Sequence, residues 1–497
     1  MTKTNNKKAL LSSAFALVLS VAMLIGTTFA WFTDTASTGV NKIVSGNLKV
    51  DIIGETSDSH ISTLKFTKAG AETDAGAAEE ILWEPGCRYL TEGFRIANKG
   101  NLALKWKAQV NMNNIINGKV EGSTIAKDGK SLLDVIDFYV VTSTDENAEA
   151  VAIENFVGNL KKTETSEVYY IKGVMQTTAG NDYQDLTLDG ITVTVIATQD
   201  TVENDSFNNQ YDKDAEYPIL VTTGDELQAI VSNATAPVNI VLANSITTNN
   251  FVIPADKDVT LDLNGRTVTN AGSHTILNKG HLTLTDSSTD KSGQIISLKG
   301  NTAALRNGDN AVCVVEGGTI SRDGANGNTW HVVENFGKMT FNGGKVVLKN
   351  GNGFAITNGW NYFDPGASTT HAVMEINALE LDTDSSGIKN CRYGDLTVND
   401  ATVTSTGYWA LSNDYLGTAV INGGTLTSNS FKAVSNGAAM TVNGGTFDGT
   451  EGLFVQSYAT STVLNGGTFT NMNVDALSSY VGTGHTAQQS GTSVIIK

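Results

Sequence analysis

Histidine and cysteine are the side chains that most often bind transition metals, and in this sequence neither forms a metal-binding pattern. The six histidines are scattered, and no His-Glu-x-x-His pair is present to place two imidazoles on one face of a helix. The three cysteines have spacings that fit neither a zinc knuckle nor a disulfide framework, and at most one pair could bridge: Cys87, Cys313 and Cys391. We therefore expect no metal site, no cofactor and no protease activity.

Carboxylates are the next candidates, because enzymes that cleave acidic polysaccharides combine clustered acids with a lysine or arginine that neutralises the substrate. The sequence contains none of the spaced-Asp, His-Gly and Arg-x-Lys signatures of polygalacturonases. Its isolated acids are more typical of solvated turns: Asp382, Asp384, Asp395 and Asp414. We expect no catalytic residues and no enzyme, and we keep a polysaccharide-acting lyase or glycosidase as the alternative function.

Aromatic side chains recur between sequence repeats in the second half of the chain. If they lie along one edge of the fold, they would form a stacking surface for glycans or for a partner protein. The other interpretation is that they fill irregular loops or the interior of the fold. The residues concerned are Trp330, Trp360, Tyr362, Tyr393, Trp409 and Tyr415, together with Tyr408 and Tyr458.

The bulk composition limits both the fold and the partners. At 497 residues the chain exceeds what one compact core usually holds, which predicts two or more domains. Gly is abundant at 50 residues, Pro is scarce at 5, and charged residues make up only 17%, a balance typical of many short strands joined by tight turns. The net charge of -18 repels phosphate backbones and anionic headgroups, so we expect neither nucleic acid nor a membrane surface as a partner.

The beginning of the chain has the pattern of a secretion signal over residues 1–30. Three lysines precede an apolar run over residues 9–26, and small residues then mark a cleavage site between Ala30 and Trp31. An uncleaved membrane anchor is the alternative, because the run is long enough to span a bilayer. With cleavage, the membrane is a partner only during export, and the mature protein belongs to the extracellular matrix or cell surface of a bacterium.

Residues 31–215 show the two-residue period of half-buried strands. The alternating residues are Leu48, Val50 and Ile52; Leu102, Leu104, Trp106, Ala108 and Val110; and Ile191, Val193, Val195 and Ala197. Separated strands of this kind need a second sheet to cover their apolar face, so the pattern predicts a β-sandwich of the jelly-roll kind. We also expect a short helix over residues 131–140.

Three segments of this region resemble the TasA/camelysin family. They are the small-residue cleavage site with Trp31, Phe32 and the later strand 46–50; a Pro85-Gly86 turn with Asn98, Gly100 and Leu102; and a closing strand that ends at 197–199. The resemblance implies cleavage by a SipW-type signal peptidase and polymerisation by strand donation, with Trp31, Phe32, Leu48 and Val50 in the donated segment. Packing of that segment within its own chain is the alternative.

From residue 217 onward a Gly-Gly phrase recurs, usually after Asn. It occurs at Gly317, Gly343, Gly423, Gly444 and Gly466, with a final spacing of about 21 or 22 residues. A period of this size predicts a solenoid. Gly would supply the positive φ of each corner, and Asn stacked on Asn in successive coils would form a hydrogen-bonded ladder. The segment resembles right-handed parallel β-helices of the pectate-lyase-like or adhesin type.

The solenoid is expected to occupy residues 217–497, with roughly ten to twelve coils at about 4.8 Å per coil. Thr223 and Glu226 form a capping-box pattern, which predicts a short helix that covers the first coil. We therefore expect an all-β protein with a structural or adhesive role at the cell surface or in a biofilm matrix. Expected partners are further copies of the chain or related matrix subunits, and extracellular glycans. A glycan-binding surface protein that does not polymerise is a third alternative.

Overall fold

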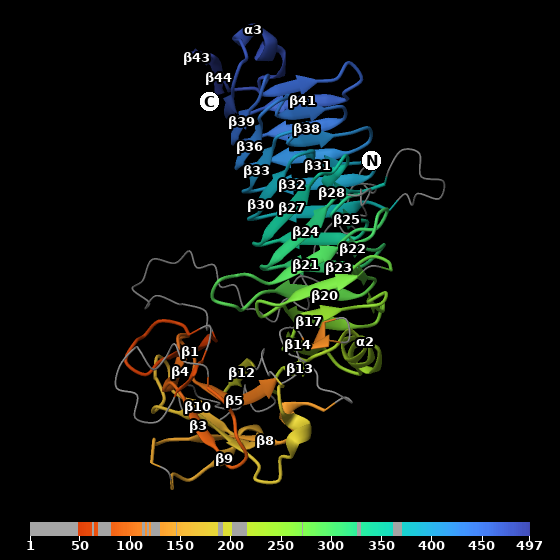
Figure 1. Ribbon diagram of the computed structural model, residues 1–497. Coiled ribbons are helices and arrows are strands. Elements are labelled where there is room, and N and C mark those ends of the chain that lie inside the picture. Colours follow the sequence, from red (N-terminus) through yellow and green to blue (C-terminus); the bar gives the residue numbers. More distant parts are fainter. Residues whose placement is uncertain are drawn as a thin grey trace, which may run out of the picture. The chain divides into compact units, whose positions relative to one another are not determined.

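A computed structural model of the protein describes residues 48–61, 64–67, 81–111, 115–116, 119–120, 130–145, 147–186, 192–200, 216–270, 272–325, 330–360 and 370–497. Within these residues the fold is mostly β, with small antiparallel sheets followed by a parallel β-solenoid of about 10 turns (Figure 1). The predicted fold class is thereby confirmed. Several predictions concern residues outside the described part of the chain. They are the signal peptide, the cleavage site between Ala30 and Trp31, and the roles of Phe32 and Tyr362.

The described part of the N-terminal region contains four small antiparallel sheets. One pairs β1 (Val50–Gly54) with β4 (Phe94–Asn98), and a short hairpin joins β6 (Ile115–Ile116) to β7 (Lys119–Val120). A three-stranded sheet has the order β10 (Val157–Leu160), β5 (Leu104–Asn111), β12 (Thr192–Gln199). A five-stranded sheet has the order β2 (Phe66–Thr67), β3 (Arg88–Thr91), β11 (Tyr170–Met175), β8 (Ile136–Val141), β9 (Val151–Ala152).

One apolar core joins the β1–β4, three-stranded and five-stranded sheets. Leu104, Trp106 and Ala108 alternate into it from β5, as their spacing predicts. The Trp106 indole contacts the Phe156 ring edge-to-face, with 4.8 Å between the ring centroids. Gly158 on the neighbouring strand leaves the space that this indole occupies, because a Cβ there would lie 2.6 Å from the Trp106 ring. The core therefore depends on a large residue packed directly over a glycine.

The expected helix over residues 131–140 is largely absent from the structure. Only η2 (Leu132–Asp134) forms a helical turn, begun by Ser131, and β8 follows at Ile136. Ile136, Phe138 and Val140 alternate into the core, so burial on a sheet outweighs the local capping signal.

The strand expected to contribute to assembly pairs within its own chain where the structure describes it. Val50 begins β1, which runs antiparallel to β4 with Val50 opposite Asn98. Leu48 precedes the strand and is exposed. Donation of the segment that begins at Trp31 stays a prediction, because that residue lies outside the described part of the chain.

Each coil of the solenoid contributes strands to three sheets, which we call the first, second and third sheet in chain order. The first sheet consists of β13 (Ile219–Val221), β14 (Val238–Leu242), β17 (Asp258–Asp262), β20 (His281–Thr285), β23 (Val312–Val315), β26 (Lys338–Phe341), β29 (Ala372–Ile376), β32 (Gly394–Val398), β35 (Thr418–Ile421), β38 (Ala439–Val442) and β41 (Ser461–Leu464). The third sheet consists of β16 (Val252–Ile253), β19 (Ile276–Asn278), β22 (Leu305–Asn307), β25 (Val333–Asn335), β28 (Phe354–Asn358), β31 (Ser386–Asn390), β34 (Leu411–Asn413), β37 (Val434–Asn436) and β40 (Leu453–Val455).

The second sheet lies between them along each coil and carries the C-terminal hairpin at its end. Its strands are β15 (Ile246–Thr247), β18 (Thr267–Asn270), β21 (Gln294–Ser297), β24 (Thr319–Asp323), β27 (Lys345–Lys349), β30 (Glu380–Thr383), β33 (Thr402–Ser405), β36 (Thr425–Ser428), β39 (Thr446–Asp448), β42 (Gly467–Phe469), β44 (Ser493–Ile496) and β43 (Ala487–Ser490). The inward side chains of all three sheets form one continuous apolar core. Strand after strand is stacked in parallel along its length (Figure 1).

Both ends of the solenoid core are covered. At the start, α2 (Gly224–Asn233) buries Leu227 and Val231, and the Thr223 hydroxyl caps it by accepting a hydrogen bond from the Glu226 N–H at 3.2 Å. At the end, α3 (Val474–Leu477) buries Leu477, and β44 pairs antiparallel with β42, which ends the parallel stacking. Among the described residues, no helix combines the length and the hydropathy needed to cross a membrane.

Two asparagine ladders run along the solenoid. The predicted ladder is exposed and follows the Gly-Gly corners, where the side-chain amides bond from coil to coil at 2.7–3.0 Å: Asn342, Asn377, Asn399, Asn422, Asn443 and Asn465. A second ladder, which we did not predict, is buried at the end of the third-sheet strands: Asn278, Asn307, Asn335, Asn358, Asn390, Asn413 and Asn436. Its amides also bond backbone carbonyls, so they satisfy the buried corner.

The conformation expected at the Gly-Gly corners was assigned to the wrong glycine. The second glycine of each pair has φ between +87° and +109°: Gly318, Gly344, Gly424, Gly445 and Gly467. The first glycine of the pair at Gly444 is instead confined by the coil beside it, because a Cβ there would lie 2.6 Å from the Asn422 carbonyl oxygen. The second glycine is therefore required for its positive φ, and the first because the neighbouring coil leaves no room for a Cβ.

Candidate functional site

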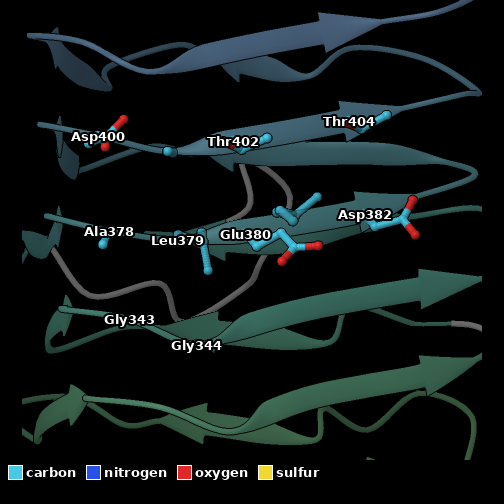
Figure 2. Close-up of a pocket in the computed structure, with 11 residues that line it drawn as sticks. Gly343, Gly344, Ala378, Leu379, Glu380, Asp382, Asp400, Thr402 and Thr404 are labelled. Carbon is cyan, nitrogen blue, oxygen red and sulfur yellow. The ribbon is translucent and has the colours of Figure 1, made fainter. Parts of the chain in front are cut away.

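A hollow in the described surface lies on the outer side of the second sheet. It has a volume of about 560 Å³ and opens over Gly343 and Gly344. Figure 2 shows Glu380 and Asp382 on the next coil and Thr402 and Thr404 on the coil after that. Glu380 pairs with Lys345, and Asp382 pairs with Lys349 at 2.8 Å. The hollow arises where two glycines lack side chains, and its strand carboxylates are already paired.

The four acids singled out in the sequence do not form one cluster. Asp382 lies in β30, whereas Asp384 follows that strand and accepts the Asn350 N–H at 2.6 Å. Asp395 lies on β32 of the first sheet, 2.8 Å from His371. Asp414 follows β34 of the third sheet. Within the described residues, no group of three or more His, Cys, Asp or Glu side chains is arranged to hold a metal ion.

The outer face of the third sheet combines aromatic, charged and polar side chains. One outward residue per strand forms a single column in register along the solenoid: Val252, Leu277, Arg306, Glu334, Thr357, Lys389, Ser412, Ser435 and Phe454. The column follows from the buried ladder, because each of these residues except Val252 and Phe454 directly precedes a ladder asparagine. The inward asparagine thus fixes the outward direction of its neighbour.

The predicted aromatics border this column on two sides. Trp330 and Trp409 lie at the corner that leads into the third sheet, just before β25 and β34. Trp360, Tyr393 and Tyr415 lie at the opposite corner, just after β28, β31 and β34. They do not share one edge, and none of them is fully buried, so they do not fill the coil interior. Tyr362 lies outside the described residues.

The N-terminal half of this face contains a buried carboxylate. Glu334 is 4% exposed at its side chain and accepts hydrogen bonds from the Arg306 guanidinium and the Trp330 indole, each at 2.9 Å. Arg306 also lies over the Phe336 ring, 4.5 Å from its centroid. Burial lowers the pKa of the adjacent His331 imidazole, and the Glu334 charge opposes that effect. These contacts fix Trp330 as part of a rigid ion-pair cluster.

The C-terminal half combines aromatic rings with paired charges. The Trp409 ring stacks 6.1 Å from Phe454 and meets Phe431 edge-to-face at 4.7 Å. The Lys432 ammonium lies 3.6 Å from the centroid of the Phe454 ring and 3.1 Å from the Glu451 carboxylate. Lys389 pairs with Asp414 at 3.1 Å. Each of these lysines therefore has a carboxylate partner within the face.

Three tyrosines project from the same half. Tyr408 on one border is 57% exposed, and Tyr415 and Tyr458 on the other are 46% and 55% exposed. The floor between the borders is low, because it consists of Ser412 and the nearly buried Ser435. We call this half, with its three tyrosines, Trp409, Phe431, Phe454 and the two lysine–carboxylate pairs, the aromatic face.

Sequence reasoning found the tryptophans and tyrosines of this surface and one of its acids, Asp414, but missed its other charged residues and its floor. Arg306, Glu334, Lys389 and Phe454 were not singled out, because no chemical motif surrounds them. The available signal was the recurring pair of a variable residue and Asn after an apolar residue, as in Arg306-Asn307 and Glu334-Asn335.

Comparisons of the chain with protein-family models, with curated proteins and with solved structures find no match.

Proposed function

We propose that the protein is a secreted structural and adhesive component of a bacterial cell surface or biofilm matrix. The observation that carries this proposal is the outer face of the third sheet, where aromatic and charged side chains line a rigid, register-locked column. Such a surface is fixed before a partner arrives, so binding orders few side chains. The paired charges and the two ladders hold these side chains in place.

The N-terminal region supports the structural part of the proposal. Its small antiparallel sheets and the segments quoted above fit a TasA-like subunit, which implies export through a SipW-type signal peptidase and assembly by strand donation from Trp31 onward. The partners would be further copies of the chain or related matrix subunits. The solenoid ends are both capped, which favours assembly through the N-terminal region over end-to-end stacking of solenoids.

A catalytic role is not part of the proposal. Retaining and inverting glycosidases need two carboxylates free to act as acid and as base or nucleophile. On the third sheet Glu334 is held by Arg306, Asp414 by Lys389 and Glu451 by Lys432. These pairings favour a binding role over a catalytic one, and a polysaccharide-acting enzyme stays the alternative function.

The test is to secrete the full chain from a Gram-positive host and to examine the purified mature protein by negative-stain electron microscopy. We expect filaments, and we expect them to be lost when residues 31–38 are deleted, with the circular dichroism spectrum retained. Release of reducing or unsaturated sugar ends from polysaccharides would overturn the non-enzymatic proposal. Monomers that bind neither cells nor matrix would overturn the structural and adhesive one.

A further inference from the structure

We infer that the aromatic face binds an uncharged polysaccharide. The inference rests on the proposed adhesive role and names the ligand class that this role would use. The first step is the chemistry of the rings. Pyranose rings present flat patches of C–H groups that pack on aromatic faces, while their hydroxyls need hydrogen-bond partners at the rim. The aromatic face offers both, with tyrosine and tryptophan rings beside lysine, carboxylate and serine side chains.

The second step is the charge of the surface. Lys389 pairs with Asp414 and Lys432 with Glu451, so the two cations and two anions of the aromatic face cancel. The whole chain carries a net charge of -18, which repels anionic polymers at long range. An acidic polysaccharide would have to displace a carboxylate from each lysine. A neutral polysaccharide can bind while both ion pairs stay intact.

The third step is the size and shape of the surface. Between the borders lies the three-residue strand β34, about 10 Å long at about 3.3 Å per residue. From β31 to β40 the column crosses three inter-strand spacings, about 14 Å at about 4.8 Å each. This floor alone is far below the roughly 800 Å² per partner that a stable protein interface buries. It suits two or three sugar rings of a longer chain that lies over the serine floor.

Affinity electrophoresis of the secreted full chain in native gels tests this inference. The gels contain laminarin, xyloglucan or dextran as neutral polymers, or polygalacturonate as the anionic one. We expect at least one neutral polymer to retard the protein and polygalacturonate to leave it unretarded. Tyr415→Ala and Tyr458→Ala should each weaken retardation about tenfold. Both rings are largely exposed, so their removal leaves the fold intact, which circular dichroism checks.

The matched control is Val463→Ala, because Val463 is an exposed apolar residue on β41 of the first sheet, away from the aromatic face. It should bind like the wild type. Retardation that survives Tyr415→Ala and Tyr458→Ala unchanged would place binding elsewhere and overturn the inference. Preference for polygalacturonate, no retardation in any neutral gel, or self-association abolished by Tyr415→Ala would also overturn it. Filaments that persist without glycan binding would separate this failure from that of the proposed function.

Discussion

Replacing Asn390 by leucine tests whether the buried asparagine ladder holds the coils together. Asn390 is fully buried, and its amide nitrogen donates to Gly394 O, Asn413 Oδ1 and Thr418 O at 2.9–3.0 Å. Its Oδ1 accepts from Asn358 at 2.9 Å. Leucine has the same number of side-chain heavy atoms and the same branching at Cγ but no polar group, so its neighbours would face an apolar side chain. A buried polar group left without its partner costs about 1 to 3 kcal/mol, and this figure already includes the lost bond. Asn358 keeps its bonds to Ala372 O and Asp395 O, so fewer than four groups lose their only partner.

We therefore expect Asn390→Leu to lower the free energy of unfolding by about 2 to 5 kcal/mol. The matched control is Asn443→Leu in the exposed ladder, where Asn443 donates to Asn422 at 2.8 Å and accepts from Asn465 at 2.9 Å. Water can replace both partners there, so the loss should stay within about 1 kcal/mol. Urea denaturation followed by circular dichroism gives the comparison. Equal losses for the two variants would refute the assignment of stability to the buried ladder.

Three further changes have defined outcomes. Gly445→Val places a β-branched residue at φ +107° and should cost about 1 to 3 kcal/mol, measured by thermal unfolding; an unchanged melting temperature would contradict that corner geometry. Gly158→Ala puts a methyl group into the Trp106 ring and should lower stability by about 1 to 3 kcal/mol and alter the near-ultraviolet circular dichroism, whereas an unaltered spectrum would mean that the ring is not packed there. Burial lowers the pKa of His274, whose Nδ1 accepts the Ala303 N–H, so the unfolded state binds a proton at a pH where the folded state does not. The free energy of unfolding is therefore highest above about pH 6.5 and falls as the pH drops below it. His274→Gln should reduce this pH dependence, measured by urea titrations at pH 5 and 7.

The solenoid could be predicted because its corners repeat in the sequence. Asn and Gly-Gly recur, with spacings of 21 and 22 residues over the last three corners, and both the exposed ladder and the capping helix at Thr223 follow from residue types alone. The positive φ was placed on Gly444 rather than Gly445 because both residues are glycine and only the backbone path distinguishes them.

The third sheet was harder to anticipate. Its strands in the C-terminal coils span only three residues, as in β34 and β37, too short for a periodic signal, and the loops on either side vary in length. The outward position of Lys389 depends on Asn390 pointing inward, which depends in turn on the ladder between coils. The pairing of charges across the aromatic face is therefore a property of the stacked coils and not of any single segment.

Because both ends of the solenoid core are capped, its length depends on how many repeat units the gene encodes between the caps. Each coil bonds only its two neighbours. The spacings between Asn422, Asn443 and Asn465 show that one coil takes 21 or 22 residues. A tandem duplication of one such unit would therefore extend the rod by about 4.8 Å while leaving both terminal caps unaltered. A lineage can thus change the distance over which this surface is presented by copying or deleting units. The length of the rod would then change with the number of repeat units, and its binding surface with point substitutions on the third sheet.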